Sequence, residues 1–336
     1  GQLGDGTVID RSMPVQIEPS GVTKVVCGMH NTFYVKTDGS VWGVGRNGNG
    51  ILGDGTTLDR NISVQIISSG VVDISVGFRP DNQALFLMTD SSLWGVGSNQ
   101  GRLGDGVGTM RYKPIMIRSS GVQGMSAGNQ HSIYLDQNGS LWSMGLNHNG
   151  YLGDGTTNNR LSPIEIVSSG VTWTSTFDET SFFLDSGGIV WGWGRNSAGQ
   201  LGDGSTTDRL SPVQILTEQI SREDFAQGYR HALFIKEDGS LWGMGQTADY
   251  RMGDGQDTVD LLVPTQILSG AQTNPRLLTL NLGAGGASVS GAGKKDFNVG
   301  TSIFATPSPG YLFSSWAGDF ISTDANASVT MNANKE

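Results

Sequence analysis

The side chains best placed to do chemistry in this sequence are an aspartate and an arginine that recur six residues apart. The aspartate is the third residue of the motif Leu-Gly-Asp-Gly, and the pairs are Asp54 with Arg60, Asp154 with Arg160, and Asp203 with Arg209. A carboxylate and a guanidinium at this spacing can form a charge-assisted pair that fastens a loop to its own repeat. In the last copy Asp260 replaces the arginine, so Asp254 should lack this partner.

A calcium site is the alternative for the same residues, because carboxylates and glycines in tandem loops also suit that ion. Calcium loops usually supply several carboxylates at alternate positions, whereas each copy here reliably offers one. We therefore favour the ion pair, and the sequence predicts neither a metal site nor a cofactor.

Histidine is the other residue type that suggests catalysis. His131 and His231 lie eleven residues before a tryptophan, and the other copies hold Asn31, Gln83 and Thr180 there. A position that accepts any small polar group needs a hydrogen bond and not an imidazole, so a structural bond within the repeat is predicted. His148 has no serine, cysteine or carboxylate partner at a spacing typical of a catalytic site, and no catalytic or phosphate-binding motif occurs. No enzyme is predicted.

These residues belong to a repeat of about fifty residues, a period that suits the four short strands of a propeller blade. The motif begins at Leu3, Leu52, Leu103, Leu152 and Leu201, and returns at Met252. Every copy but the first follows a tryptophan that is predicted to wedge between blades: Trp42, Trp94, Trp142, Trp191 and Trp242.

Within one repeat, four runs rich in β-branched and aromatic residues read as strands, namely PVQI, VTKVVC, NTFYVKT and SVWGVG. Five full units are expected, at residues 14–45, 63–97, 114–145, 163–194 and 212–245, with PTQI (264–267) left over. Asp38-Gly39 predicts a primed hairpin turn with positive φ at both positions, and Asp90-Ser91 a strained or differently shaped one. The predicted fold is all-β, a propeller of four-stranded blades.

Composition excludes several functional classes. The net charge of −10 argues against wrapping nucleic acid, because phosphate binding needs clustered Lys and Arg. No stretch approaches the twenty or so apolar residues of a membrane-spanning segment. Cys27, with apolar neighbours, is expected to be a small buried side chain. The chain opens in the middle of a repeat, and we expect it to be a fragment.

The segment GNQHSIYLDQNGSLWSMGLNHNGYLGDGTTNNR (128–160) resembles a repeat of the regulator of chromosome condensation family. The resemblance covers about residues 1–268 and implies a β-propeller, commonly of seven blades when intact, that binds proteins on its faces. Five complete blades and a spare strand cannot seal such a ring. We therefore expect an open arc with an uncovered edge, or an imperfectly closed smaller ring.

Three kinds of family member provide functional alternatives. The nucleotide exchange factor for a small GTPase carries added parts, and the largest internal insertion here is about three residues, near 78–83. The plant photoreceptor uses tryptophans where this sequence has Met29, Phe78, Asn129 and Tyr229, so that chromophore is absent. The secreted inhibitor of β-lactamases resembles this sequence in being a bare scaffold with variable loops.

The C-terminal segment has a different character. After a linker at 269–276, residues 277–336 resemble the divergent internalin-type B repeats of bacterial surface and secreted proteins, through GTSIFATPSPGYLFSSWAGD (300–319) and VTMNANK (329–335). This small β domain looks truncated. Phe313 and Trp316 are predicted to form its core, with an exposed carbohydrate-stacking role as the alternative.

The combined interpretation is a bacterial extracellular or cell-surface binding protein that recognises a protein, or a glycan, through variable propeller loops. The alternatives are a GTPase regulator of the exchange-factor type, a secreted enzyme inhibitor, and an enzyme whose catalytic part lies outside this chain. Positions that differ between copies are free to specify a partner, and Tyr and Arg often anchor interfaces. The candidate binding residues are Phe78, Arg79, Arg102, Tyr151, Tyr229, Tyr250 and Arg251. Of these, Arg102, Tyr151 and Arg251 are expected to be exposed on one common face.

Overall fold

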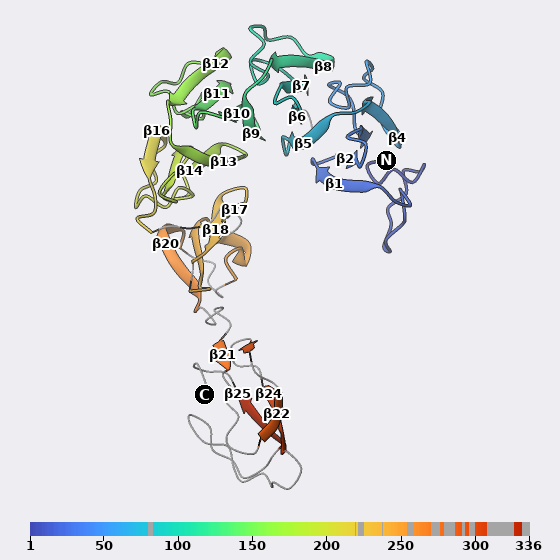
Figure 1. The fold of residues 1–336 in the computed structure, drawn as a ribbon. Helices are drawn as coiled ribbons and strands as arrows, with labels where there is room; N and C mark the ends of the chain where they lie inside the picture. The colour runs from blue at the N-terminus through green and yellow to red at the C-terminus, as the bar shows by residue number, and fades with distance from the viewer. Residues whose placement is uncertain are drawn as a thin grey trace. The chain divides into compact units, whose positions relative to one another are not determined.

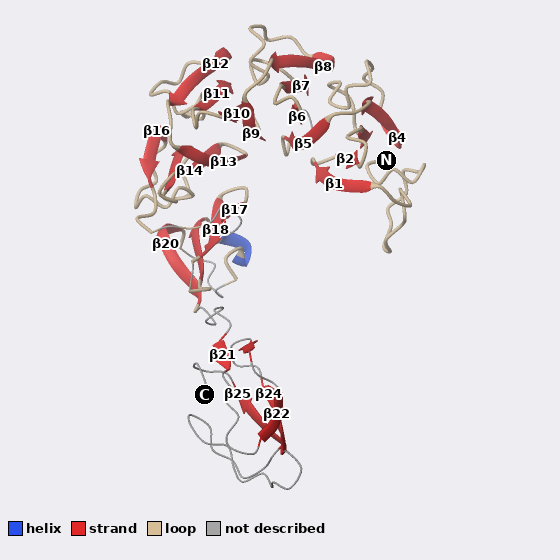
Figure 2. Cartoon of the chain, viewed as in Figure 1, coloured by secondary structure: helices blue, strands red, loops and turns tan. Residues whose placement is uncertain are grey.

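A computed structural model describes residues 1–79, 83–218, 220, 225–236, 238–253 and 259–269 of the chain. In the C-terminal region it describes the backbone of 276–278, 286–290, 293–295, 300–307 and 326–330. The described part is built almost wholly from strands, with one 3-10 turn, η2 (Ala248–Tyr250), among them (Figure 2). The all-β prediction is confirmed.

Five four-stranded antiparallel sheets form the blades, and in each the strands pair in sequence order. Blade 1 contains β1 (Val22–Cys27), β2 (Asn31–Lys36), β3 (Val41–Gly45) and β4 (Arg60–Ile67). Blade 2 contains β5 (Val71–Val76), β6 (Gln83–Met88), β7 (Leu93–Gly97) and β8 (Arg111–Arg118). Blade 3 contains β9 (Val122–Ala127), β10 (His131–Asp136), β11 (Leu141–Gly145) and β12 (Arg160–Val167).

The last two blades repeat this plan. Blade 4 contains β13 (Val171–Phe177), β14 (Thr180–Asp185), β15 (Val190–Gly194) and β16 (Arg209–Gln214). Blade 5 contains β17 (Phe225–Gln227), β18 (His231–Ile235), β19 (Leu241–Gly245) and β20 (Leu261–Leu268). Five complete blades are therefore present, as the repeat count predicted.

The predicted grouping of strands into blades is wrong by one strand. Gly43 in β3 pairs with Val64 in β4, so the SVQI run closes the blade that precedes it and does not open the next one. Residues 264–267 belong to β20 and are not left over, whereas PVQI at 14–17 lies in no strand. The physical reason is that the chain reverses direction in the Leu-Gly-Asp-Gly loop, so the strand after the loop pairs with the strand before it.

The turn between the second and third strands of each blade also differs from the prediction. Gly39 has φ 73°, but Asp38 is not among the residues with positive φ. The amide of Gly39 donates to Lys36 and that of Lys36 to Ser40, which indicates a three-residue loop with a left-handed third residue. In blade 2 Ser91 takes this place with φ 63°, so the strain expected at Asp90-Ser91 is present.

The apolar cores lie between successive blades. Phe33 and Leu52 of blade 1 pack with Ile74 and Phe86 of blade 2, each at most 3% exposed. Burying each such side chain contributes about 1.5–3 kcal/mol. The motif tryptophans are half-buried at the margins of these cores, where Trp94 and Trp191 pack, whereas Trp193 is the fully buried indole. Blade stacking thus provides the core that one blade lacks.

The chain divides into two compact units, of which the first holds Gly1–Phe234 and Gly243–Thr265. Within this unit the blades follow one another along an arc, with β1, β5, β9 and β13 on its inner side and β4, β8, β12 and β16 on its outer side (Figure 1). Val22 at the start of β1 is 37% exposed, whereas the equivalent Val71, Val122 and Val171 are 1–4% exposed. The first blade therefore has an uncovered face, as the expected open arc requires.

Cys27 lies on this uncovered strand and is exposed, so the expectation of a buried thiol is wrong. Val25 and Val26 precede Cys27 in β1, but no described blade comes before blade 1 to cover this strand.

The second unit comprises Ile235–Trp242 and Gln266–Glu336. Its C-terminal part contains β21 (Arg276–Leu278), β22 (Gly286–Ser290), β23 (Gly293–Lys295), β24 (Gly300–Pro307) and β25 (Asn326–Thr330). These strands form an antiparallel pair β21-β23 and a sheet of order β22-β24-β25. Phe313 and Trp316, the predicted core of this region, lie outside the described residues.

Candidate interaction surface

The Leu-Gly-Asp-Gly loops are built around the repeated aspartate. In blade 3, Asp154 Oδ1 accepts hydrogen bonds from the amide and hydroxyl of Thr156 at 3.0 and 2.8 Å, and Oδ2 accepts one from Arg160 Nε at 2.8 Å. The expected ion pairs are formed, at 2.5 Å for Asp54–Arg60, 2.6 Å for Asp154–Arg160 and 2.5 Å for Asp203–Arg209. Each aspartate is thus held by donors from its own loop.

Electrostatics agree with this arrangement. Burial alone would raise the pKa of Asp154, but its hydrogen bonds from Thr156 and Arg160 hold that pKa below the usual range. Among the described residues no three His, Cys, Asp or Glu side chains converge as a metal site would require. Asp254, predicted to lack its arginine, lies outside the described residues; Asp260 accepts a hydrogen bond from the Thr247 amide at 3.2 Å.

A buried asparagine in the same loop was not predicted from the sequence. Asn147 is fully buried, and its Nδ2 donates to Asp154 Oδ1 at 2.9 Å and to the Thr156 carbonyl at 3.0 Å. Its Oδ1 accepts from the amide of Leu152 at 2.9 Å. The signal was visible in the repeat, because the other blades hold Asn47, Asn99, Asn196 and, in the last, Thr247 at the same position.

The histidine position serves the seam between blades. His131 is fully buried, and its Nε2 lies 2.7 Å from Ser181 Oγ of blade 4. Gln83 of blade 2 donates to the carbonyls of Gly128 and His131 in blade 3. The predicted bond within one repeat is therefore wrong for these two residues, since both bonds join neighbouring blades. Burial, with the nearby Arg102 charge, lowers the pKa of His131 to about 3, so its imidazole is neutral.

Arg102 and Tyr151, expected to be exposed, are buried at 9% and 3% exposure. Arg102 Nη1 donates to Ser98, and the Tyr151 ring stacks on His131 with centroids 6.0 Å apart. In four copies the residue before the motif leucine lies in the seam between blades, and Ile51 and Gln200 are therefore buried too. Arg251 is half-buried, with ion-pair contact to Asp249 at 2.9 Å. The predicted shared face of these three residues is not formed.

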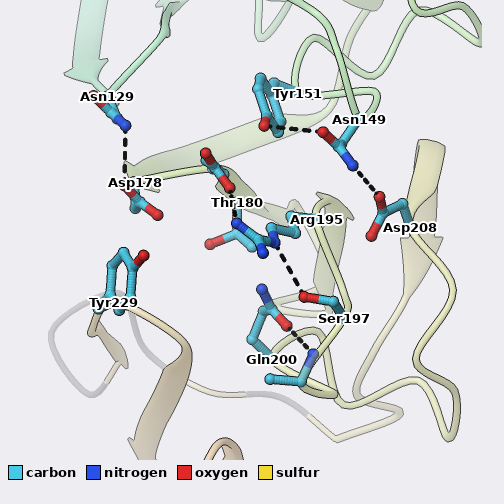
Figure 3. A network of polar contacts seen from close by, with 12 residues as sticks. Asn129, Asn149, Tyr151, Asp178, Thr180, Arg195, Ser197, Gln200, Asp208 and Tyr229 are labelled. Atoms are coloured by element: carbon cyan, nitrogen blue, oxygen red, sulfur yellow. Dashed lines mark hydrogen bonds and ion pairs between the residues drawn. The ribbon is translucent and has the colours of Figure 1, made fainter.

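The turns after the first strands of blades 2 to 5 do converge. Arg79 lies 3.5 Å from Asp178 of blade 4 and donates to the Tyr229 hydroxyl of blade 5 at 3.4 Å. Asn129 of blade 3 donates to Asp178 at 3.1 Å, as Figure 3 shows. The rings of Phe78 and Phe177 lie 5.2 Å apart. We call the set Phe78, Arg79, Asn129, Asp178 and Tyr229 the inner-turn surface.

This surface combines exposed aromatic and cationic groups with a buried acid beneath them. Phe78 is 44% exposed and Tyr229 38% exposed, whereas Asp178 is 4% exposed. Burial and the adjacent Glu179 raise the pKa of Asp178, which costs free energy that the Arg79 pairing partly offsets. Asp178 also has φ 53°, a conformation that a non-glycine residue adopts rarely and that accumulates at functional positions. The sequence indicated Phe78, Arg79 and Tyr229 as candidates, but it did not indicate the contact between Arg79 and Tyr229.

A second polar network supports the turn of blade 4 (Figure 3). Arg195 Nη1 contacts Glu179 Oε2 at 2.6 Å, and Arg195 Nε donates to Ser197 Oγ at 3.0 Å. This pair fixes the residue that follows Asp178. Tyr250, the remaining candidate, is 60% exposed in η2, and no described contact joins it to the inner-turn surface.

Comparison with known proteins identifies the repeats. Residues 187–235 and 122–150 match the regulator of chromosome condensation (RCC1) repeat, and residues 277–336 match the divergent InlB B-repeat domain. Among curated proteins none matches the sequence significantly. Within the part of the chain that the structure describes, we find no helix with the length and apolar character needed to cross a membrane.

Solved propellers resemble the fold at low identity. Human WBSCR16 matches with a TM-score of 0.63 and 17% identity, over 86% of this chain and 75% of that one. Yeast RCC1 (Prp20), solved with Kap60, matches with 0.61 and 19%, over 84% and 68%. Prp20p from Saccharomyces cerevisiae matches with 0.57 and 16%, over 75% and 78%. The chain carries RCC1 repeats folded as β-propeller blades and a divergent InlB B-repeat domain.

Proposed function

We propose that this chain is a bacterial extracellular or cell-surface binding protein that holds a partner protein on the inner-turn surface. The RCC1-like propeller together with a bacterial-type repeat domain supports a protein-binding role. The observation that carries the proposal is that Arg79, next to Phe78 in blade 2, contacts Asp178 of blade 4 and Tyr229 of blade 5. Exposed aromatic and arginine side chains gathered in one place are typical of interface hot spots.

Preorganisation supports this surface as the docking site. The Arg79 guanidinium is fixed by Asp178 and lies 5.5 Å from the Tyr229 ring centroid, and Arg230 stacks on the same ring at 5.1 Å. Side chains already held in place lose less conformational entropy when a partner binds. The surface therefore offers rigid contact area without a conformational change of the blades.

The extracellular location rests on the B-repeat domain, whose type suggests a bacterial surface protein. We propose a division into propeller repeats at 1–268, a linker at 269–276 and a B-repeat domain at 277–336, in which the B-repeat domain displays the propeller. A glycan is the alternative ligand for the same surface.

A GTPase regulator is the second candidate. Its support is the fold likeness to Prp20p, whose structure was described together with binding to Gsp1p and histones. That likeness concerns the fold, since the identity is 16%.

Affinity capture separates these functions. The intact chain is immobilised and exposed separately to secreted, surface and cytoplasmic fractions of the producing bacterium, with a small GTPase and a β-lactamase added as defined candidates. We expect a secreted or surface protein to be retained by the wild type and released by the double variant Arg79→Ala, Tyr229→Ala. Retention of the GTPase alone would favour the second candidate, and retention that ignores both substitutions would refute the inner-turn surface.

A further inference from the structure

An aromatic cage in blade 3 holds a cation from the chain itself. The rings of Tyr134 and Trp142 stack with centroids 6.1 Å apart and an interplanar angle of 6°, and Trp142 Nε1 donates to Asp136 Oδ2 at 3.3 Å. The guanidinium carbon of Arg118, from β8 of blade 2, lies 5.6 Å from both ring centroids. Arg118 Nη2 is 3.8 Å from the Asp136 carboxylate and Nη1 donates to the Tyr134 hydroxyl at 3.2 Å, so the cation is held by two rings, an acid and a hydroxyl.

Blade 4 repeats this cage without the arginine. The rings of Phe183 and Trp191 stack at 5.9 Å and 5°, and Trp191 Nε1 donates to Asp185 Oδ2 at 3.0 Å. Strand register shows what is missing: Arg118 pairs with Leu93 at the start of β7, and Val167 pairs with Leu141 at the start of β11. Val167 of blade 3 is therefore the residue equivalent to Arg118 of blade 2.

A pocket of about 540 Å³ lies at this position, lined by Phe183, Asp185 and Trp191 together with Ile166, Val167 and Pro212. Asp136, under Arg118, has a side chain only 5% exposed, whereas Asp185 is partly exposed. Hydrogen bonds from Trp191 and two backbone amides hold the pKa of Asp185 below its usual range, against the burial that would raise it. The pocket therefore presents a carboxylate and an aromatic face to solvent.

Blades 1 and 5 also place a cation over this indole. Lys36 lies 4.7 Å from the Trp42 ring centroid in blade 1, and Lys236 lies 3.7 Å from that of Trp242 in blade 5. Among the described contacts, no cation of the chain lies over Trp191. Blade 2 provides a contrast, because its pocket at Trp94 contains Met88 and Lys113, and Trp94 Nε1 donates to a serine instead of a carboxylate.

We propose that the blade 4 cage, formed by Phe183, Asp185 and Trp191, binds the guanidinium of an arginine side chain presented by a partner protein. The ring faces supply a cation–π attraction and Asp185 the partner of an ion pair, as the two rings and Asp136 do for Arg118 in blade 3. The net charge of −10 favours a basic partner segment. The cage shares no residue with the inner-turn surface, so the two proposals fail separately.

Indole NMR of the intact, isotopically labelled chain tests the site, with N-acetyl-arginine amide as the probe. This blocked compound presents the guanidinium as a protein does. We expect the Trp191 Nε1–H signal to shift in a saturable way while the Trp94 and Trp142 signals stay fixed. N-acetyl-citrulline amide, the neutral matched probe, should bind at least about tenfold more weakly, because it lacks the charge. Equal responses to both probes, or no shift at Trp191, would overturn the proposal.

Reciprocal variants move the site between blades. Val167→Arg should fill the blade 4 cage and weaken probe binding there at least about tenfold, since the new guanidinium competes within the same molecule. Arg118→Val should open the blade 3 cage, so that the Trp142 signal begins to respond. Unchanged Trp94 shifts report an intact fold in each variant. If Val167→Arg still binds the probe at Trp191, or if Arg118→Val leaves Trp142 silent, the cage does not select the cation.

Discussion

The Leu-Gly-Asp-Gly loops and the inner turns follow opposite rules within the same blades. In the loops the asparagine, aspartate and arginine return from copy to copy, and the aspartate side chains are only 2–8% exposed in the first five copies. In the inner turns the equivalent residues are Phe78, Asn129, Asp178 and Tyr229, and two of them are well exposed. The repeated residues build each blade, whereas the changing ones form the surface that we propose for partner binding.

The largest loss of stability should follow removal of a buried loop carboxylate. Asp154→Ala leaves the donors of Asn147, Thr156 and Arg160 without their acceptor, and we expect a cost of about 2–4 kcal/mol. Urea unfolding measures this cost. Asn158→Ala, an exposed change in the same loop, should stay within about 0.5 kcal/mol. Equal stability of the two variants would mean that the loop is not organised by its aspartate.

The buried asparagine should follow in size. Asn147→Ala removes two donated hydrogen bonds and leaves the Leu152 amide without an acceptor, at a cost of about 2 kcal/mol. Amide hydrogen exchange at Leu152 should accelerate in the variant, because that amide loses its acceptor. Unchanged exchange at this amide would contradict the assigned role.

The loop arginine should matter less than its partner. In the Arg160→Ala variant Asp154 still accepts hydrogen bonds from Asn147 and Thr156, and Arg160 is itself 34% exposed. We expect a cost of about 1 kcal/mol, partly screened by salt. Thermal unfolding at low and high ionic strength measures both features. A loss as large as that of Asp154→Ala would show that the guanidinium is the organising group.

Acid should destabilise the seam between blades 3 and 4 through His131. The unfolded chain takes up a proton as the pH falls below about 6.5, but the folded chain does not until about 3, so stability falls with pH across this window. The contribution reaches at most about 1.4 kcal/mol per pH unit. His131→Gln, which copies Gln83, should reduce the loss of melting temperature between pH 7 and pH 5. An identical pH profile for both proteins would contradict a buried neutral imidazole.

The sequence predicted those features that depend on residues close together in one repeat. The Asp–Arg pairs join residues six apart, and the number of blades follows from the number of repeats. The last strand of each blade was assigned to the wrong blade or to none, because a strand of this composition can pair with the strand before it or with the strand after it. These strands are β4, β8, β12, β16 and β20. Arg102 and Tyr151 looked like exposed loop residues, since only the stacking of the next blade buries them.

Several residues of the inner-turn surface could be predicted from the sequence, but the contacts between them could not. Phe78, Arg79 and Tyr229 differ from the equivalent residues of other copies, and that variation was visible in the sequence. The contact between Arg79 and Tyr229 joins two residues that are 150 positions apart in the sequence, and it arises from the curvature of the arc. Curvature is a sum of small rotations between blades, which no single repeat specifies.

The most direct test of the inner-turn surface measures stability and affinity in the same variants. The double variant Arg79→Ala, Tyr229→Ala should stay folded, with a measurable loss of stability because the buried Asp178 loses its arginine partner, yet raise the Kd for the captured partner at least about tenfold. Leu58→Ala, a change at a more exposed residue outside the surface, should alter neither quantity. A folded double variant that binds the partner as tightly as the wild type would contradict the account.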